Sequence, residues 1–76
     1  MGTVHRESGF TFHIWSEDHE PPHVHAWKAG GEVVVLLDPV SVREVERMKP
    51  KAVAQVVAIV GAHRVKMLRY WREIHE

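Results

Sequence analysis

The apolar residues that follow Pro50 recur at helical spacing, and this stripe restricts the fold of the chain more than any other feature. The stripe consists of Val53, Val56, Val57, Val60, Met67, Leu68, Trp71 and Ile74. At about 3.6 residues per turn these positions cover an arc of about 120°, the width of a core-facing helix surface. The spacing stays in phase across Gly61, so it predicts one long helix over residues 50–75 that must pack on another layer, with a kink at Gly61 as the alternative.

Strands before residue 38 are predicted to supply that layer. Residues 3–7 and 10–15 favour strand structure and form two pieces of a first strand, with a turn or bulge at Gly9. Alternation in the second piece places three apolar side chains on one face: Phe10, Phe12 and Ile14.

A β-hairpin is predicted next. Residues 23–28 and 32–37 flank a glycine pair at 30–31, and paired glycines suit the positive φ angles of a two-residue hairpin loop. With this loop, His23 lies directly opposite Asp38, and a carboxylate there would orient the imidazole.

A short helix is predicted between the hairpin and the long helix. Ser41 and Glu44 have the spacing of a capping box, which predicts a helix over about residues 42–48. Its buried side would hold Val42, Val45 and Met48. Strands followed by helices indicate an α+β fold, namely an antiparallel sheet of about three strands followed by a short and a long α-helix packed on one face.

Composition limits the class of protein. The 76 residues correspond to a single domain, and the absence of cysteine excludes disulfides and cysteine-ligated zinc. Ten basic and ten acidic residues cancel, so bulk charge favours neither nucleic acid nor a membrane surface. The longest apolar run, residues 33–37, is too short to span a bilayer. We therefore expect a cytoplasmic protein with no membrane partner.

Chemically active side chains concentrate in residues 17–25. The Pro21-Pro22 pair favours an extended backbone that leads into a strand, on which His23 and His25 point to the same face. Three interpretations stay open for this pair: a solvated polar face, a metal site, or a pH-sensitive interface. A metal site needs a third donor, and zinc is the candidate ion. The candidate donors are Asp18, His19, His13 and Asp38, of which His13 or Asp38 is predicted to lie nearest to the pair.

Arg64 lies near the middle of the apolar stripe. Because a buried unpaired charge is costly, its side chain either extends to solvent or pairs with an acidic partner. The candidate partners are Asp18, Glu20 and Asp38. We also treat His13, Asp38 and Arg64 as a candidate polar site.

Two surfaces of the long helix are candidates for binding partners. The side opposite the stripe forms a basic face that could contact nucleic acid, made of Lys51, Lys66, Arg69 and Arg72. A straight helix over residues 50–75 would overhang so small a domain and expose an apolar patch, made of Leu68, Tyr70, Trp71 and Ile74. Such a patch predicts a symmetric homodimer.

One segment carries a family resemblance: Asp18-His19-Glu20-Pro21-Pro22-His23-Val24-His25. It is preceded by Arg6 and Gly9-Phe10 and followed by Gly31-Glu32 and Leu37-Asp38-Pro39. With these residues, nearly the whole chain resembles the small bacterial domain-of-unknown-function family numbered four-one-six-zero. The resemblance implies a single-domain bacterial protein, often encoded beside a second small protein and sometimes labelled a toxin–antitoxin component or regulator. It implies no catalytic residues.

Three classes of function stay open. The favoured one is an interaction or regulatory module of a toxin–antitoxin-type gene pair, with a protein partner encoded nearby. The first alternative is a metal-dependent hydrolytic enzyme in which His23 and His25 hold the ion. The second alternative is a nucleic-acid-binding protein that uses the basic helix face.

Overall fold

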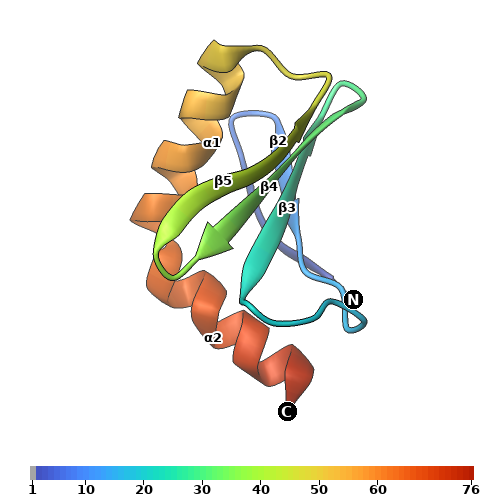
Figure 1. The fold of residues 1–76 in the computed structure, drawn as a ribbon, viewed down its shortest axis with the longest axis vertical. Helices are drawn as coiled ribbons and strands as arrows, with labels where there is room; N and C mark the ends of the chain where they lie inside the picture. Colours follow the sequence, from blue (N-terminus) through green and yellow to red (C-terminus); the bar gives the residue numbers. More distant parts are fainter. Residues whose placement is uncertain (1) are drawn as a thin grey trace.

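The computed structural model describes residues 2–76, which form one antiparallel sheet with two helices on the same side of it (Figure 1). The five strands lie in sequence order: β1 Thr3–Glu7, β2 Phe10–His13, β3 His23–Lys28, β4 Gly31–Leu37 and β5 Val40–Glu46. The helices are α1 Pro50–Ala62 and α2 Arg64–His75. The predicted α+β class is confirmed, but the sheet has five strands where about three were expected.

The predicted first strand is two strands. Ser8 and Gly9 have φ angles of 53° and 81°, so the chain reverses there and β2 runs antiparallel to β1. The turn at Gly9 is thereby confirmed, and β1 becomes one edge of the sheet.

The segment after Asp38 is a strand, so the predicted helix over residues 42–48 is wrong. Leu37 pairs with Val40, which shows that the chain turns back at once and continues along β4. Pairing with β4 satisfies backbone groups along the whole segment, whereas a capping box satisfies only those at one helix end. Two of the three residues that were expected on the buried side of this helix are exposed to solvent, because Val42 and Val45 are 42% and 45% exposed.

The long helix is interrupted, so the predicted continuous helix over residues 50–75 is also wrong. The break lies at His63 and not at Gly61, because His63 has φ −114° and ψ 20°, outside the helical region. The described residues span 34 × 21 × 20 Å, which is shorter than the roughly 39 Å of a straight helix over 50–75. The bend therefore removes the predicted overhang.

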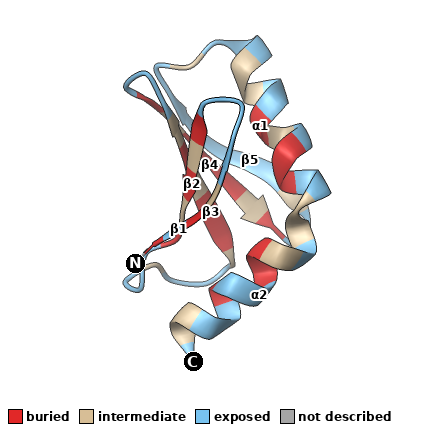
Figure 2. Ribbon diagram, turned by 180° about the vertical axis from the view of Figure 1, so that it is seen from behind, coloured by how far each residue is buried: buried red, intermediate tan, exposed pale blue. Residues whose placement is uncertain are grey.

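The core lies between the sheet and the two helices, and Figure 2 shows that both layers carry buried residues. The sheet contributes Val4, Phe10, Phe12, Ile14, Val24, Ala26, Val33, Val35 and Leu37, and the helices contribute Val56, Ile59, Val60, Met67, Leu68 and Trp71. Most of the predicted stripe is thus core. Each fully buried Val, Leu or Phe side chain stabilises the fold by about 1.5–3 kcal/mol relative to exposure.

The same packing changes the predicted dimer patch. Leu68 and Trp71 are buried and Ile74 packs against the core, while Tyr70 stays partly exposed at 37%. The patch is therefore not the exposed apolar surface that was expected. The homodimer itself stays a prediction, now without this surface to support it.

The β3–β4 loop lies one residue earlier than predicted. Lys28 pairs with Gly31, so the loop is Ala29-Gly30, with φ angles of 50° and 81°. His23 consequently pairs with Leu36 and not with Asp38. Moving the loop by one residue moves the pairing by two, so every side chain keeps its predicted face.

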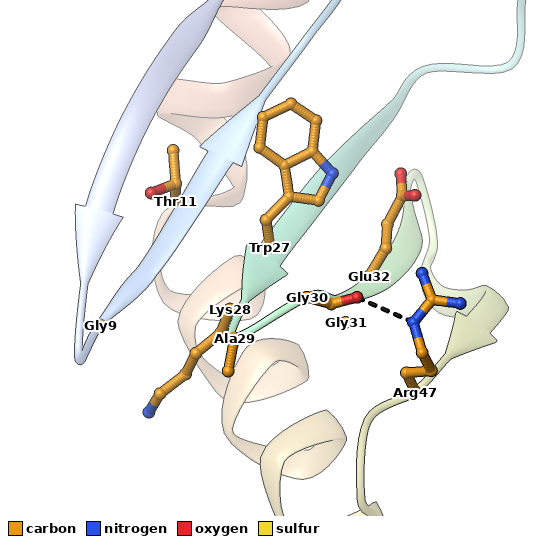
Figure 3. A pocket seen from close by; sticks show the side chains of 9 residues that line it. All are labelled: Gly9, Thr11, Trp27, Lys28, Ala29, Gly30, Gly31, Glu32 and Arg47. Atoms are coloured by element: carbon orange, nitrogen blue, oxygen red, sulfur yellow. Dashed lines mark hydrogen bonds between the residues drawn. The ribbon is translucent and has the colours of Figure 1, made fainter.

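Substitutions in this turn test the observed register (Figure 3). A Cβ on Gly31 would overlap the carbonyl oxygen of Arg47, whereas a Cβ on Gly30 meets open space at a positive φ. We expect Gly30→Ala to lower the free energy of unfolding by about 1–2 kcal/mol, and Gly31→Ala to lower it more because the backbone must shift. Urea denaturation measures both, and equal losses would contradict the register.

Candidate functional site

Polar side chains gather on the sheet face that the helices do not cover. His13 pairs with His25, His25 with Val34, and Val34 with Glu44, so these four residues form one row across β2 to β5. Directly paired residues point to the same side of a sheet. The row therefore places a histidine and a carboxylate from distant parts of the sequence beside the loop that precedes β3.

Asp18, in that loop, faces two histidines of β3. Its Oδ1 lies 3.5 Å from Nε2 of His23 and 3.4 Å from Nε2 of His25, and the two rings meet edge-on with centroids 5.2 Å apart. The side chains are mostly buried, at 14%, 7% and 16% exposure respectively. We call Asp18, His23 and His25 the histidine–aspartate site. The two histidines share one face of β3, as predicted, but Asp18, and not His13 or Asp38, completes the group of donors within 4.8 Å of one another.

The other ring nitrogens fix which nitrogen carries the proton. Nδ1 of His23 lies 2.9 Å from the carbonyl oxygen of Pro21, and Nδ1 of His25 lies 2.7 Å from a carboxylate oxygen of Glu32. Both partners can only accept, so both Nδ1 atoms donate. Nε2 of each ring then faces the Asp18 carboxylate. A protonated Nε2 donates to Asp18, and a neutral ring presents there a lone pair that a cation can bind.

The loop and α2 hold Asp18 in place. The backbone N–H of Trp15 donates to Asp18 Oδ2 at 2.9 Å, and Nε2 of His75 lies 3.0 Å from the Asp18 carbonyl oxygen. Trp71 packs beside His23, with ring centroids 5.2 Å apart. The bend at His63 thus brings the end of α2 to the site, and Trp71 supports the site where a dimer contact was expected.

Asp18 is held as a carboxylate. Burial acts to raise its pKa, but the Trp15 N–H together with the nearby His25 and His23 outweighs burial. The pKa of Asp18 therefore lies below its ordinary value of 3.8. An ionised carboxylate between two imidazole nitrogens attracts cations.

A β-bulge directs two further side chains to this site. Val34 pairs with Glu44 but Val35 pairs with Val42, which leaves Arg43 as an extra residue in β5. Arg43 and Glu44 both line a pocket of about 260 Å³ together with the histidine–aspartate site. Sequence reasoning missed both residues because it assigned this segment to a helix.

Glu32 was also missed, although the sequence held a signal for it. On a hairpin with the loop at Ala29-Gly30, His25 and Glu32 lie diagonally across β3 and β4, and long side chains reach that far. The loop predicted one residue later placed them farther apart.

The other three candidate donors, His19, His13 and Asp38, do not belong to the cluster. His19 is exposed and lines the same pocket, but its ring is not among the three donors, which lie within 4.8 Å of one another.

The predicted polar site of His13, Asp38 and Arg64 is separated. Arg64 pairs with Asp38 at 2.5 Å and donates to the Leu37 carbonyl oxygen at 2.7 Å, which confirms an acidic partner for Arg64. His13 stacks instead with Trp15 and Trp27, at centroid distances of 3.9 and 4.9 Å. Burial is the main cause that lowers the pKa of His13.

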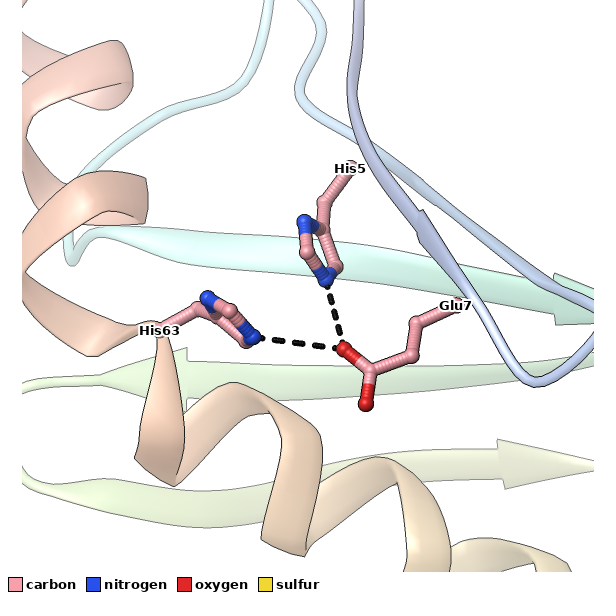
Figure 4. Close-up of side chains that lie close together, drawn as sticks. All are labelled: His5, Glu7 and His63. Carbon is pink, nitrogen blue, oxygen red and sulfur yellow. Dashed lines mark hydrogen bonds and ion pairs between the residues drawn. The ribbon is translucent and has the colours of Figure 1, made fainter.

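A second group of donors connects β1 to the helix break (Figure 4). Oε1 of Glu7 lies 2.9 Å from Nε2 of His5 and 3.2 Å from Nε2 of His63. Nζ of Lys66 lies 2.8 Å from Nδ1 of His5. We call these four residues the Lys66–His5 network. It diverts Lys66 from the predicted basic face, whereas Lys51, Arg69 and Arg72 remain exposed.

The two donor groups differ in their proton positions. A lysine ammonium can only donate, so Nδ1 of His5 accepts and its proton lies on Nε2, which donates to Glu7. The network is thus satisfied by its own hydrogen bonds. In the histidine–aspartate site, by contrast, Nδ1 of each ring donates, so Nε2 is the nitrogen that can exchange its proton for a cation.

A larger pocket of about 410 Å³ lies at the β3–β4 turn (Figure 3). Arg47 donates to the Gly30 carbonyl oxygen there, and Glu32 and Lys28 also line it. Neither group of three metal-ligating side chains found among residues 2–76 lies in this pocket. The smaller pocket is therefore the better candidate site.

The fold and the histidine–aspartate site define a small α+β domain with a two-histidine, one-carboxylate donor group on an open sheet face. The chain belongs to the family described as Domain of unknown function (DUF4160), whose model matches residues 9–72. The resemblance inferred from the sequence is thereby confirmed. Comparisons with curated proteins and with solved structures find no match. Within residues 2–76, neither helix is long and apolar enough to cross a membrane.

Asp18 should make stability depend on pH in acid. Because its folded-state pKa is depressed below 3.8, its contribution is present above that value and is lost as pH falls through the folded-state pKa. We expect Asp18→Asn to flatten the decline in unfolding free energy below about pH 4. Urea denaturation at several pH values measures this, with Glu17→Gln at the neighbouring exposed position as the control. Parallel curves for wild type and Asp18→Asn would contradict the assignment.

Proposed function

We propose that the protein is a divalent-metal-binding domain whose ion is held by Asp18, His23 and His25. The observation that carries the proposal is the pair of acceptors on the two Nδ1 atoms, Pro21 and Glu32. Metal-ligating histidines commonly donate their second ring N–H to a carbonyl or carboxylate, which orients the ring and raises its basicity. Here both histidines already have such a partner.

Distances within the site support zinc. Ligand atoms about 2.1 Å from an ion at tetrahedral angles lie about 3.4 Å apart. The Asp18 Oδ1 atom lies 3.5 and 3.4 Å from the two histidine Nε2 atoms. These two distances match tetrahedral coordination, and the three donor atoms all lie within 4.8 Å of one another.

Three protein ligands leave a fourth position for water or substrate, as in catalytic zinc sites. The 260 Å³ pocket provides space for it, and Glu44 and Arg43 line that space. Zinc lowers the pKa of a bound water, which makes it a nucleophile near neutral pH. Hydrolytic activity is therefore an extension of the proposal, in which Glu44 accepts a proton and Arg43 binds an anionic group.

A free sheet edge supports the interaction or regulatory module as a second proposal. Val42 and Val45 are exposed on β5, the last strand of the sheet, and exposed edge strands are common sites of protein contact. A toxin–antitoxin-type partner or a second copy of the chain could occupy this edge. Nucleic-acid binding is weaker, because one of its four basic residues is engaged by His5.

Metal titration tests the first proposal. We expect one zinc ion per chain, and cobalt(II) should give the intense visible spectrum of tetrahedral coordination. Asp18→Ala, His23→Ala and His25→Ala should each lower the affinity by at least about 100-fold, whereas His19→Ala serves as the control and changes it little. Folded protein that binds no ion, or loses its ion equally in His19→Ala, would refute the site.

Glu32 offers a sharper test because it contacts the ligand and not the ion. Glu32→Gln removes the charge that accepts from His25 Nδ1, so we expect a 10- to 100-fold, order-of-magnitude loss of zinc affinity with the stoichiometry retained. Glu46 pairs directly with Glu32 across β4 and β5, which makes Glu46→Gln a matched control. Equal affinities for the two variants, measured by competition with a chromophoric chelator, would show that Glu32 does not orient His25.

A further inference from the structure

We infer that Lys66 is a nucleophilic amine, activated by His5 and Glu7 and suited to react with an activated acyl group such as a thioester or an acyl phosphate. The inference is independent of metal binding, since it uses the other donor group. It rests on three side chains in one line: Lys66 Nζ lies 2.8 Å from His5 Nδ1, and His5 Nε2 lies 2.9 Å from Glu7 Oε1.

This arrangement has the order nucleophile, base and orienting carboxylate. The same arrangement activates serine, cysteine and threonine nucleophiles on unrelated folds, and it is recognised by the geometry of the side chains and not by their positions in the amino-acid sequence. Because Lys66 donates to Nδ1, the lone pair of His5 is aimed at the amine and is ready to take its proton.

Glu7 and His63 hold the base in this orientation. The hydrogen bond from His5 is the main cause that keeps the pKa of Glu7 below its ordinary value of 4.5, so Glu7 is a carboxylate that can stabilise the imidazolium formed at His5. His63 also contacts Glu7, and its ring lies against His5 with centroids 4.1 Å apart. The imidazole of His5 is only 11% exposed, which limits its rotation away from Lys66.

The reaction step balances without any further reagent. A proton moves from the Lys66 ammonium to His5 Nδ1, and the freed nitrogen lone pair attacks the acyl carbon to form a C–N bond. The bond from the acyl carbon to the leaving sulfur or oxygen breaks, and the leaving group takes that electron pair. The amide nitrogen then loses its second proton to solvent, and His5 releases its own.

The other lysines provide an internal comparison. Lys28, Lys49 and Lys51 are exposed, and Lys28 contacts the Ser8 carbonyl oxygen and the Phe10 ring. Exposure alone would make these three more reactive than Lys66, which is half-buried. Preferential reaction at Lys66 therefore separates activation by His5 from simple accessibility.

Residue-resolved acylation is the test. The full chain is treated with a substoichiometric amount of the N-hydroxysuccinimide ester of acetic acid, and the acetylation rate of each lysine is followed by peptide mass spectrometry. We expect Lys66 to react at least about 10-fold faster than Lys49 or Lys51, because general-base catalysis typically contributes 100-fold or more. The preference should vanish in urea. A folded protein in which Lys66 reacts no faster than Lys51 overturns the inference.

Variants distinguish activation from local structure. His5→Gln keeps a hydrogen-bonding side chain but removes the base, so acetylation of Lys66 should fall to the rate of Lys51 while Lys51 itself is unchanged. Arg6→Gln, on the same strand between His5 and Glu7, is the matched control and should leave the preference intact. If His5→Gln retains the preference for Lys66 while circular dichroism shows a folded chain, His5 is not the base and the inference fails.

Discussion

The packing of one sheet face against two helices is the constraint on which the rest of this structure depends. A domain of this size buries only about 60% of the surface its unfolded chain exposes, and this chain has no cysteine with which to add disulfides. Most of its buried apolar residues therefore lie between the sheet and the helices. The bend at His63 keeps both helices on that side, and it turns α2 so that Trp71 and His75 reach the loop that carries Asp18. The same packing that completes the core thus positions the first ligand of the site.

Periodicity predicted the fold where burial on one face decides the structure. Phe10, Phe12 and Ile14 are almost fully buried, as their alternation predicted, and the hairpin kept its faces although its loop was misplaced by one residue. Local signals failed where tertiary pairing competes with them. A capping box with Ser41 and Glu44 would supply fewer hydrogen bonds than pairing along the whole of β4, so that segment forms β5. Likewise, the phase of the apolar stripe is preserved across His63, and a periodicity argument cannot detect a break that leaves the phase intact.

The candidate site was predictable only as far as it is local in sequence. Asp18, His23 and His25 lie within eight positions, so the period of a strand and a rigid proline pair suffice to bring them together. Glu32 requires the exact hairpin register, and Arg43 and Glu44 require both a fifth strand and a bulge in it. His63 and Lys66 come from the helical end of the sequence and reach the Glu7 and His5 side chains of β1 only because the chain folds back on its first strand. To predict a site residue that is distant in sequence, one must know the tertiary contact that brings it to the site, and periodicity does not supply such contacts.

The two donor groups show why residue composition alone cannot assign chemistry to a cluster. Each group contains two histidines and one carboxylate, with donor atoms close enough together to surround an ion. The two groups differ in the hydrogen-bond partner of the histidine Nδ1 atom. An acceptor at Nδ1, as in His23 and His25, leaves a lone pair at Nε2 that a cation can take. A donor at Nδ1, as Lys66 is for His5, places the proton on Nε2 and turns the same side chain into a base directed at an amine. The partners of the ring, more than the ring itself, therefore separate a metal ligand from a proton acceptor in this fold.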